Sequence, residues 1–241
     1  ALDVSNSMLA RDYSPDRLDR AKLAISRLVD KLNGDRIGLV LFSGTSFVQL
    51  PITTDYVSAK MFLNNISTES VPVQGTAMGD AINTCIRSFS AQSEKSRAII
   101  VITDGENHED DPVSAAKQAA EMGISVYTIG VGSEQGQPIP MKGGLLKDSK
   151  GNIVVTKLDE STLRDVARAG NGAYVHAGND EFGLNPIIDN VRKLDEEQFS
   201  SVVFEEYDEQ YMYFFAIALA LFVIQMMVGE RKVLRHLFDK K

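Results

Sequence analysis

Oxygen-bearing side chains recur in three short stretches, each beside an apolar run with the composition of a buried strand. The first is Ala1–Ser7, which offers a carboxylate and two hydroxyls spaced two residues apart. The second is Gln74–Gly79, which offers a threonine, and the third is Ile99–Gly105, an apolar run that reaches an aspartate. Because the loops after the carboxyl ends of parallel strands gather at one edge of a sheet, we expect these side chains to meet there. The expected cluster holds two carboxylates and three hydroxyls: Asp3, Ser5, Ser7, Thr76 and Asp104.

An all-oxygen cluster of this kind suits a hard divalent cation. Mg²⁺ prefers oxygen ligands at roughly 2.0–2.1 Å in octahedral geometry and keeps several of its waters. We therefore predict Mg²⁺ as the cofactor, with Mn²⁺ and Ca²⁺ as alternatives. A lone Asp/Ser loop would be a weak signal, because such loops commonly close turns or cap helices. The prediction depends on the complete set of side chains at the ends of strands.

The three stretches together resemble the von Willebrand factor A-type domain, whose pattern is D-x-S-x-S followed by a distant threonine and a distant aspartate. The resemblance covers about Ala1 to Asn190, and all five positions match residue by residue. It implies a metal-ion-dependent adhesion site, in which a divalent cation keeps one coordination position open to a partner's carboxylate. It also implies that Asp3 and Asp104 act largely through coordinated water.

The elements that must position these residues alternate between buried strands and amphipathic helices. Ile37–Phe42 and Ser46–Ile52 are predicted strands, and their connection through Gly44 is too short for a parallel crossover, so this pair should be antiparallel. Ala98–Thr103 is the most apolar strand and should lie in mid-sheet, and Ile124–Ile129 is the next. We predict an α/β fold, a Rossmann-like, doubly wound, mostly parallel sheet with one antiparallel edge strand, followed by a C-terminal transmembrane helix.

Helix starts raise two alternatives near the expected site. Ser14 is predicted to cap the first helix, with Pro15 at its first position and Asp16 in its first turn. Thr76 precedes a helix predicted from about Met78. It lies where the N–H groups of that helix N-terminus would favour a partner's carboxylate, or it only caps the helix, or it does both. The acidic run Glu106–Pro112 is either a second metal site or a solvated loop that ends in an Asp111-Pro112 helix start, and we favour the second interpretation.

The domain organisation follows from composition. Residues 1–194 are expected to form the α/β domain, with a hairpin insertion at about residues 136–158 whose tip includes Asp148 and Gly151. The insertion either contributes to partner choice or is decoration. Only Ala1 to Val4 precede the Asp/Ser loop, so we expect the first strand to have been cut short and further residues, including membrane segments, to precede Ala1.

The end of the chain has the composition of a membrane anchor. Residues 195–210 form an acidic linker, and residues 211–228 are eighteen residues without a charge. At 1.5 Å per residue they would span about 27 Å as a helix, enough for a bilayer core. Residues 229–241 carry five basic and two acidic residues. The positive-inside rule then predicts a cytoplasmic C-terminus and an extracytoplasmic, periplasmic domain at the bacterial inner membrane.

Composition and spacing exclude several function classes. A formal net charge of −8 over 241 residues argues against nucleic-acid binding, which needs a basic face. The glycines around Gly130-Val131-Gly132 lack the spacing of a dinucleotide loop, so no nucleotide is expected. The single cysteine, Cys85, lies in an apolar helical row and should be a buried hydrophobe. His176, His108 and His236 are isolated, and no nucleophile–His–acid arrangement is present, so the chain is not expected to be an enzyme.

Within this family the chain is most similar to the bacterial membrane-anchored members of aerotolerance (Bat-type) operons. The similarity lies in the stretches Leu2–Met8, Arg17–Lys22 and Gly75–Ile82, and in the insertion and C-terminal span. This similarity implies that the domain functions in an assembly with other envelope proteins. The predicted function is a membrane-anchored, divalent-metal-dependent protein-binding module that recruits an Asp or Glu carboxylate of a partner. The alternatives are a membrane scaffold with a purely structural metal and a metal-dependent hydrolase.

Overall fold

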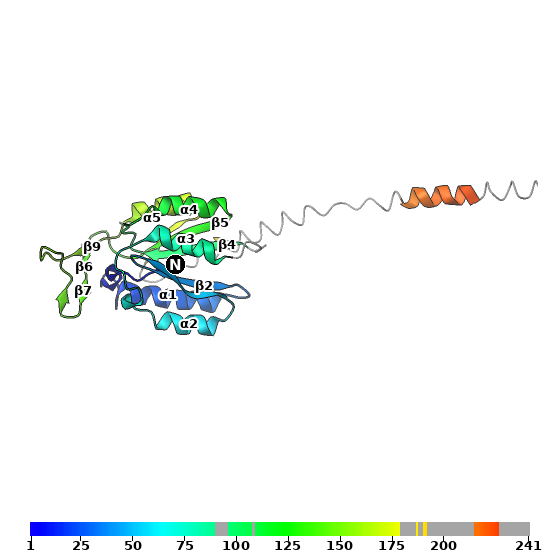
Figure 1. Cartoon of the computed structure of the whole chain (residues 1–241). Helices are drawn as coiled ribbons and strands as arrows, with labels where there is room; N and C mark the ends of the chain where they lie inside the picture. Colours follow the sequence, from blue (N-terminus) through cyan, green and yellow to red (C-terminus); the bar gives the residue numbers. More distant parts are fainter. Residues whose placement is uncertain (90–95, 108, 179–186, 188–189, 192–214, 227–241) are drawn as a thin grey trace, which may run out of the picture. The chain divides into compact units, whose positions relative to one another are not determined.

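The structure is a computed structural model that describes residues 1–89, 96–107, 109–178, 187, 190–191 and 215–226 (Figure 1). The chain divides into two compact units, Ala1–Glu197 and Gln198–Lys241. The first unit holds the predicted α/β domain. Each unit is described by itself.

A six-stranded sheet forms the centre of the first unit, in the strand order β10-β5-β4-β1-β2-β3. Neighbouring strands are parallel except for β3, which pairs antiparallel with β2 at one edge. The predicted fold class and the short antiparallel connection are therefore confirmed for the domain. The strands are β1 (Leu2–Asp3), β2 (Ile37–Phe42), β3 (Ser46–Thr53), β4 (Arg97–Thr103), β5 (Ile124–Gly130) and β10 (Tyr174–His176).

Helices cover both faces of this sheet, as Figure 1 shows. One hydrophobic core joins the sheet to α1 and α2, and a second joins the opposite face to α3, α4 and α5. Strand β2 shows why two cores form, because Leu39 and Leu41 point into the first core while Val40 and Phe42 point into the second. The helices are α1 (Arg17–Lys31), α2 (Tyr56–Asn64), α3 (Met78–Ser88), α4 (Pro112–Glu121) and α5 (Glu160–Ala169), with short 3-10 turns η1 (Asn6–Leu9) and η2 (Thr68–Ser70).

The register places the carboxyl ends of the parallel strands level with one another. Leu2 of β1 pairs with Ile102 of β4, and Thr103 of β4 pairs with Gly130 of β5. Asp3 and Thr103 therefore emerge side by side, and the loops that follow them share the same edge. This is the edge at which ligands bind in open α/β sheets.

Side-chain caps decide where two helices begin. The carboxylate of Asp16 accepts the backbone N–H of Asp19 at 2.8 Å, so α1 begins at Arg17. The prediction that Ser14 caps this helix, with Pro15 at its first position, was wrong, because a carboxylate two residues later provides the cap. At α4 the prediction is confirmed, since Asp111 accepts the N–H of Val113 at 3.1 Å and Pro112 opens the helix.

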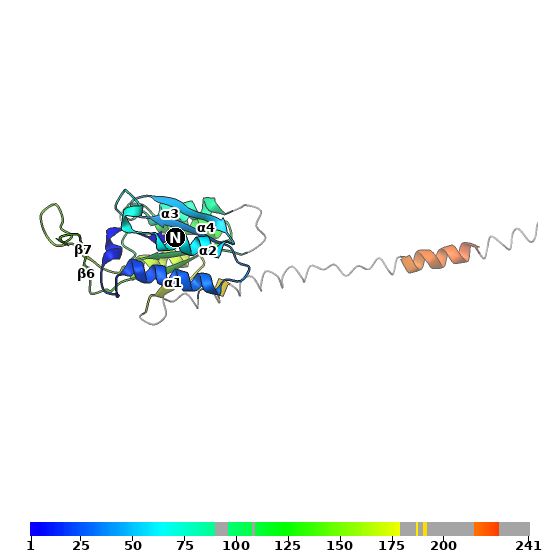
Figure 2. The same cartoon turned by 90° about the horizontal axis from the view of Figure 1, so that it is seen from below.

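The insertion folds into a small β-structure that we call the flap and define as residues 137–157. Its strands are β6 (Gln137–Pro138), β7 (Pro140–Met141), β8 (Gly144–Leu145) and β9 (Val155–Thr156). Strand β6 pairs with β9, and β7 pairs with β8. An additional bridge between Lys147 and Ile153 closes the structure. Figures 1 and 2 show the flap extending away from the helices.

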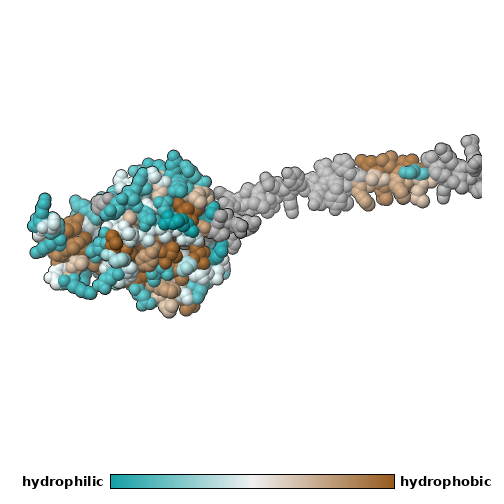
Figure 3. Space-filling model, viewed as in Figure 1, coloured by the Kyte–Doolittle hydropathy of each residue, from teal (hydrophilic) through white to brown (hydrophobic). Residues whose placement is uncertain are grey.

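The predicted membrane span lies in the second unit, where residues 215–226 form a helix with exposed side chains. Figure 3 shows this helix as mostly hydrophobic. Within the described ranges, no helix is long and apolar enough to cross a membrane. The rest of the predicted span, the acidic linker, the basic tail and most of residues 179–194 at the end of the predicted domain lie outside the described residues.

Candidate metal centre

The first loop folds around the carboxylate of Asp3, which is fully buried at the end of β1. One carboxylate oxygen, Oδ1, accepts the backbone N–H of Ser5 at 2.8 Å. The other, Oδ2, accepts the hydroxyl of Thr103 at 2.6 Å, the short distance of a charge-assisted bond. The hydroxyls of Ser5 and Ser7 lie 2.9 Å apart and are nearly buried. Asp3, Ser5 and Ser7 therefore form one compact group.

Asp104 follows β4 and is also fully buried. Its Oδ2 accepts hydrogen bonds from the Arg17 guanidinium at 2.9 Å and from the Thr156 hydroxyl at 3.0 Å. Its Oδ1 accepts the backbone N–H of Glu106 at 3.2 Å. The turn after it requires Gly105, whose φ is +82° and whose missing Cβ would lie 2.6 Å from a backbone oxygen. The local chain thus holds this carboxylate in one orientation.

Thr76 reaches the same edge through contacts of its own loop. Gln74 accepts the backbone N–H of Asn6 at 3.1 Å, which ties the Thr76 loop to the loop that carries Ser5 and Ser7. Ser43 donates its hydroxyl to the carbonyl of Gly75 at 2.9 Å. The Thr76 side chain is nearly buried, and its hydroxyl has no hydrogen-bond partner among the described residues. A hydroxyl held in this way is available to a ligand.

The two carboxylates are close enough to affect each other's ionisation. The pKa of Asp3 is raised to about 7, first by burial and then by the charge of Asp104, in spite of its hydrogen bonds. The pKa of Asp104 is raised by burial, while hydrogen bonding from Ser7 and the charge of Arg17 act in the opposite direction. Two buried carboxylates that repel each other are stabilised by a proton or by a cation.

The donor set fits a hard divalent cation. Within the described ranges, no group of three or more His, Cys, Asp or Glu side chains is placed to hold a metal ion. The oxygen donors at this edge are two carboxylates together with hydroxyls, the donor type that Mg²⁺, Mn²⁺ and Ca²⁺ prefer. The free hydroxyl of Thr76 and the mutual repulsion of Asp3 and Asp104 both agree with such a cation.

Sequence reasoning missed Arg17 at this edge, together with its partners Asp12 and Thr156. The fully buried guanidinium of Arg17 forms an ion pair with Asp104 at 2.9 Å and with Asp12 at 2.6 Å. It also donates to the Thr156 hydroxyl at 3.2 Å. Gly132 leaves room for it, because a Cβ there would lie 2.8 Å from the guanidinium carbon. A signal was present, since Arg17 lies four residues before the buried Ala21 and so on the apolar face of α1.

The acidic run after Asp104 caps α3. Asp110 accepts the backbone N–H groups of Gly79 at 3.0 Å and Asp80 at 2.7 Å, and Asn107 accepts that of Met78 at 3.1 Å. Thr76 therefore does not cap α3. The N–H groups at the start of α3, which were expected to favour a partner's carboxylate, already donate to Asn107 and Asp110. Asp110 acts as a cap, and Asp111 caps α4, so two acids of this run have structural roles, in agreement with the favoured interpretation.

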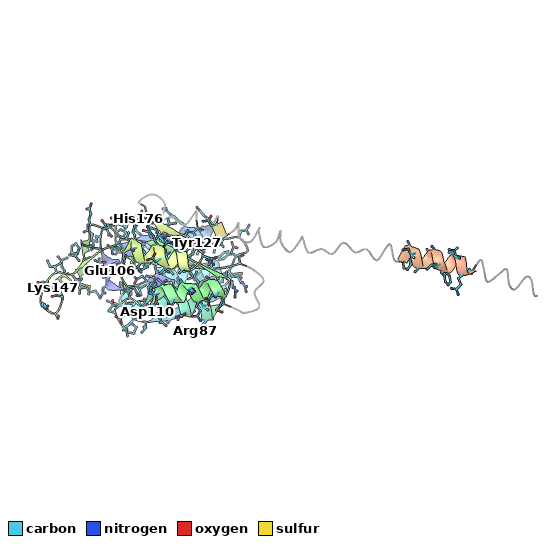
Figure 4. The ribbon with its side chains drawn as sticks, turned by 90° about the horizontal axis from the view of Figure 1, so that it is seen from above. Arg87, Glu106, Asp110, Tyr127, Lys147 and His176 are labelled. Carbon is cyan, nitrogen blue, oxygen red and sulfur yellow. The ribbon has the colours of Figure 1, made fainter. Side chains whose placement is uncertain are left out.

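A separate cavity of about 490 Å³ lies beside the ends of β5 and β10. It is lined in part by Tyr13, Ser133, Glu160 and His176. The Nδ1 atom of His176 lies 2.9 Å from Glu160 Oε1, so this histidine has a partner, as expected of a satisfied surface histidine. Figure 4 shows His176 and Glu106 at different places on the domain. The lining of the cavity also includes Asp12 and Gly132, which contact or adjoin Arg17, but none of the five predicted metal ligands.

Comparisons with known proteins agree with this geometry. The family model of the von Willebrand factor type A domain matches residues 1–169. A solved aerotolerance-related membrane protein from Bacteroides fragilis, carrying multiple mutations to serine, is 48% identical with a TM-score of 0.77, over 80% of this chain and 96% of that one. BatB from Bacteroides thetaiotaomicron is 48% identical with a TM-score of 0.73, over 85% and 97% of the two chains.

More distant proteins extend the comparison. A mussel byssus protein, proximal thread matrix protein 1 with a zinc-occupied MIDAS motif, is 20% identical with a TM-score of 0.58, over 80% of this chain and 43% of that one, and this likeness shows the fold alone. A UPF0353 protein from Nocardia farcinica is 31% identical over 74% of this chain. The chain spans 57% of the length of that relative. With the matched family model and the shared fold, this chain belongs to the von Willebrand factor type A domain family and resembles the aerotolerance-related, Bat-type membrane proteins of bacteria.

Proposed function

We propose that this chain is a membrane-anchored, divalent-metal-dependent module that binds a carboxylate of a partner protein. The supporting observation is the group at the sheet edge, where two buried carboxylates repel each other beside the hydroxyls of Ser5 and Ser7, and where the loop that carries Thr76 is hydrogen-bonded to the Ser5–Ser7 loop. Mg²⁺ is the proposed cation, and Mn²⁺ and Ca²⁺ are alternatives. When bound, the cation supplies an electrophilic position that a partner's Asp or Glu completes.

The hydrogen bonds at the site suggest different roles for its oxygens. Both oxygens of Asp3 and both oxygens of Asp104 already accept hydrogen bonds from the protein. The hydroxyl of Thr76 has no such bond within the described part of the chain. We infer that Ser5, Ser7 and Thr76 contact the cation directly and that the carboxylates act mainly through bound water. Neutral direct ligands leave the cation's charge available to an incoming carboxylate.

Binding is a better interpretation than catalysis. The groups that contact Asp3 and Asp104 in the described structure are hydroxyls, backbone N–H groups and one guanidinium. None of these is a ready general base near neutral pH. The pKa of Asp3 itself is raised to about 7, but both of its oxygens already accept hydrogen bonds from the protein. The family and the Bat-type relatives are typically non-catalytic, and we propose that this chain is not an enzyme.

The proposed setting is the bacterial inner membrane. The Bacteroides fragilis relative is a membrane protein, and residues 211–228 are uncharged. We propose that they anchor the chain as a single span, with the domain periplasmic and the basic tail cytoplasmic. Other envelope proteins are then the accessible partners.

The test combines metal binding with partner capture. Calorimetric titration of Mg²⁺ should show binding to the wild-type chain and strongly reduced binding to Thr76→Val, which removes the hydroxyl and keeps the shape. Thr54→Val is the matched control, because Thr54 is exposed outside the site. A partner from envelope extract should be retained by wild type in Mg²⁺ and lost in EDTA or with Asp104→Ala. Retention in all three conditions would identify a scaffold whose metal is structural.

A further inference from the structure

The flap has two unlike faces. Ile153, Val155 and Lys157 are exposed, whereas the residues between them, Val154 and Thr156, are half-buried and buried. The opposite strand shows the same alternation. Leu145 and Lys147 are exposed, and Leu146 between them is half-buried. Since side chains alternate across a strand, the exposed residues share one outward face.

The strand register agrees with this assignment. Lys147 bridges to Ile153, and Val155 pairs with Pro138. The outward face therefore carries Leu145, Ile153 and Val155, which are 40%, 51% and 49% exposed. Figure 3 shows hydrophobic residues on the flap, at the left of the molecule. Three large apolar side chains exposed together on a small sheet are typical of an interaction surface.

The same face carries two lysines, Lys147 and Lys157, in an acidic chain. The flap contains four lysines and one aspartate, whereas the whole chain has a formal net charge of −8. Lys147 and Lys157 form no ion pair among the described residues. Figure 4 shows Lys147 on the flap, away from the helices. A local basic patch of this kind steers an acidic partner that the rest of the chain would repel.

The base of the flap is joined to the candidate metal centre. The Thr156 hydroxyl donates to Asp104 at 3.0 Å, and the backbone N–H of Lys157 donates to Glu106 at 2.9 Å. Val155 and Lys157 are the chain neighbours of Thr156, so the outward face begins one residue from the residue that contacts Asp104. The flap and the metal centre therefore form adjoining parts of one end of the domain.

We propose that the outward face of the flap is the second half of the partner-binding surface and takes an extended, acidic segment of a partner protein with apolar side chains between the acids. This inference rests on the proposed function. The partner must already bring one carboxylate to the metal centre, and further acids of the same segment would meet Lys147 and Lys157. Its apolar side chains would cover Leu145, Ile153 and Val155.

The probe is a short fluorescent peptide in which glutamate alternates with valine, followed by anisotropy with the full chain in detergent and Mg²⁺. The double variant Lys147→Glu/Lys157→Glu should weaken binding by about tenfold or more, because two attractions become repulsions. Ile153→Ser/Val155→Ser should weaken it as well. Lys117→Glu on α4 is the control for a single reversal, since Lys117 is exposed on another element, and it is compared with Lys147→Glu alone, which has the same charge change.

Several results would overturn the flap proposal. One is equal binding of the peptide by the flap variants and the control, and another is equal binding of a peptide with lysine in place of glutamate. A third is Lys147-dependent capture of phosphatidylglycerol vesicles without peptide binding, and a fourth is a dimer that disappears in the Ile153→Ser/Val155→Ser variant.

The effect of Mg²⁺ on peptide affinity shows separately whether the proposed function fails. If EDTA and Thr76→Val leave peptide affinity unchanged while the lysine reversals weaken it, the metal role is wrong and the flap surface stands. If Mg²⁺ strengthens binding but the reversals do not matter, the flap proposal is wrong.

Discussion

Replacing Arg17 by methionine tests whether the buried guanidinium holds the candidate site together. Methionine retains much of the apolar stem of arginine but removes the charge and every donor. Asp104 would keep the Thr156 hydroxyl and the Glu106 N–H, and would lose its ion pair. Asp12 would lose its contacts from two guanidinium nitrogens. Two carboxylates, one fully buried and one nearly so, would then lack their counter-ion.

The expected loss of stability follows from this geometry. Removing one partner of a buried ion pair costs about 3–5 kcal/mol, because the remaining charge stays buried without compensation. For a domain of this size each kcal/mol lowers Tm by roughly 2–4 °C, so Tm should fall by about 6–20 °C. Arg17→Lys should recover part of this loss only, since an ammonium cannot reproduce the planar fork that contacts Asp12 and Asp104 together.

Thermal and denaturant unfolding in EDTA would measure the effect. Arg27→Met is the matched control, because Arg27 is an exposed arginine on the same helix and its loss should change stability by at most about 0.5 kcal/mol. If a cation binds as proposed, Mg²⁺ should restore part of the loss, because it compensates Asp104. An Arg17→Met variant as stable as Arg27→Met would refute the idea that Arg17 neutralises the buried carboxylates.

Three other predictions concern the helices α3 and α5. Asp110→Ala should destabilise the domain by about 1–2 kcal/mol, because α3 loses the acceptor of two N–H groups, while calorimetry should find an unchanged Mg²⁺ affinity; weakened metal binding would instead make Asp110 part of the site. Leu163→Ala should cost about 2–5 kcal/mol in denaturant unfolding, because Leu163 is fully buried between α5 and the sheet; a cost below about 1 kcal/mol would mean that this core is loosely packed. The pKa of Glu160 is lowered, chiefly by hydrogen bonding from Arg164. The ionised Glu160 side chain therefore stabilises the domain above its unfolded pKa of about 4.3, and this stability is lost as the pH falls through the lower folded pKa. The free energy of unfolding of Glu160→Gln should fall less than that of wild type over this pH range, and identical pH profiles would contradict the prediction.

The pattern of apolar residues was sufficient to predict the sheet. Strands such as Ala98–Thr103 and Ile124–Ile129 were predicted to within about a residue of their observed bounds. Short-range geometry also determined the antiparallel pairing of β2 and β3, because the three residues between them cannot carry a parallel crossover. These features depend on local spacing, which is visible without the fold.

The helix starts show where local reasoning was insufficient. Asp111 caps α4 from its own chain neighbourhood, and the prediction was confirmed. At α3 the cap comes from Asp110, thirty or more residues away along the chain, and no local pattern around Thr76 could show it. A cap contributed across the fold is visible only when the strands β2, β1 and β4 bring the two loops together.

At the candidate site, too, some features were predicted from the sequence and others were seen only in the structure. The residue types and spacing predict five oxygen donors, because a hard cation requires such ligands and strand ends gather at one edge. Only the tertiary structure revealed that Arg17 and Thr156 contact Asp104 and that Asp12 pairs with the same Arg17, since these contacts join residues as far apart as positions 17 and 156. It also revealed that the flap begins beside Asp104. Burial is the physical reason, because a carboxylate removed from water needs partners that the fold, rather than the neighbouring sequence, supplies.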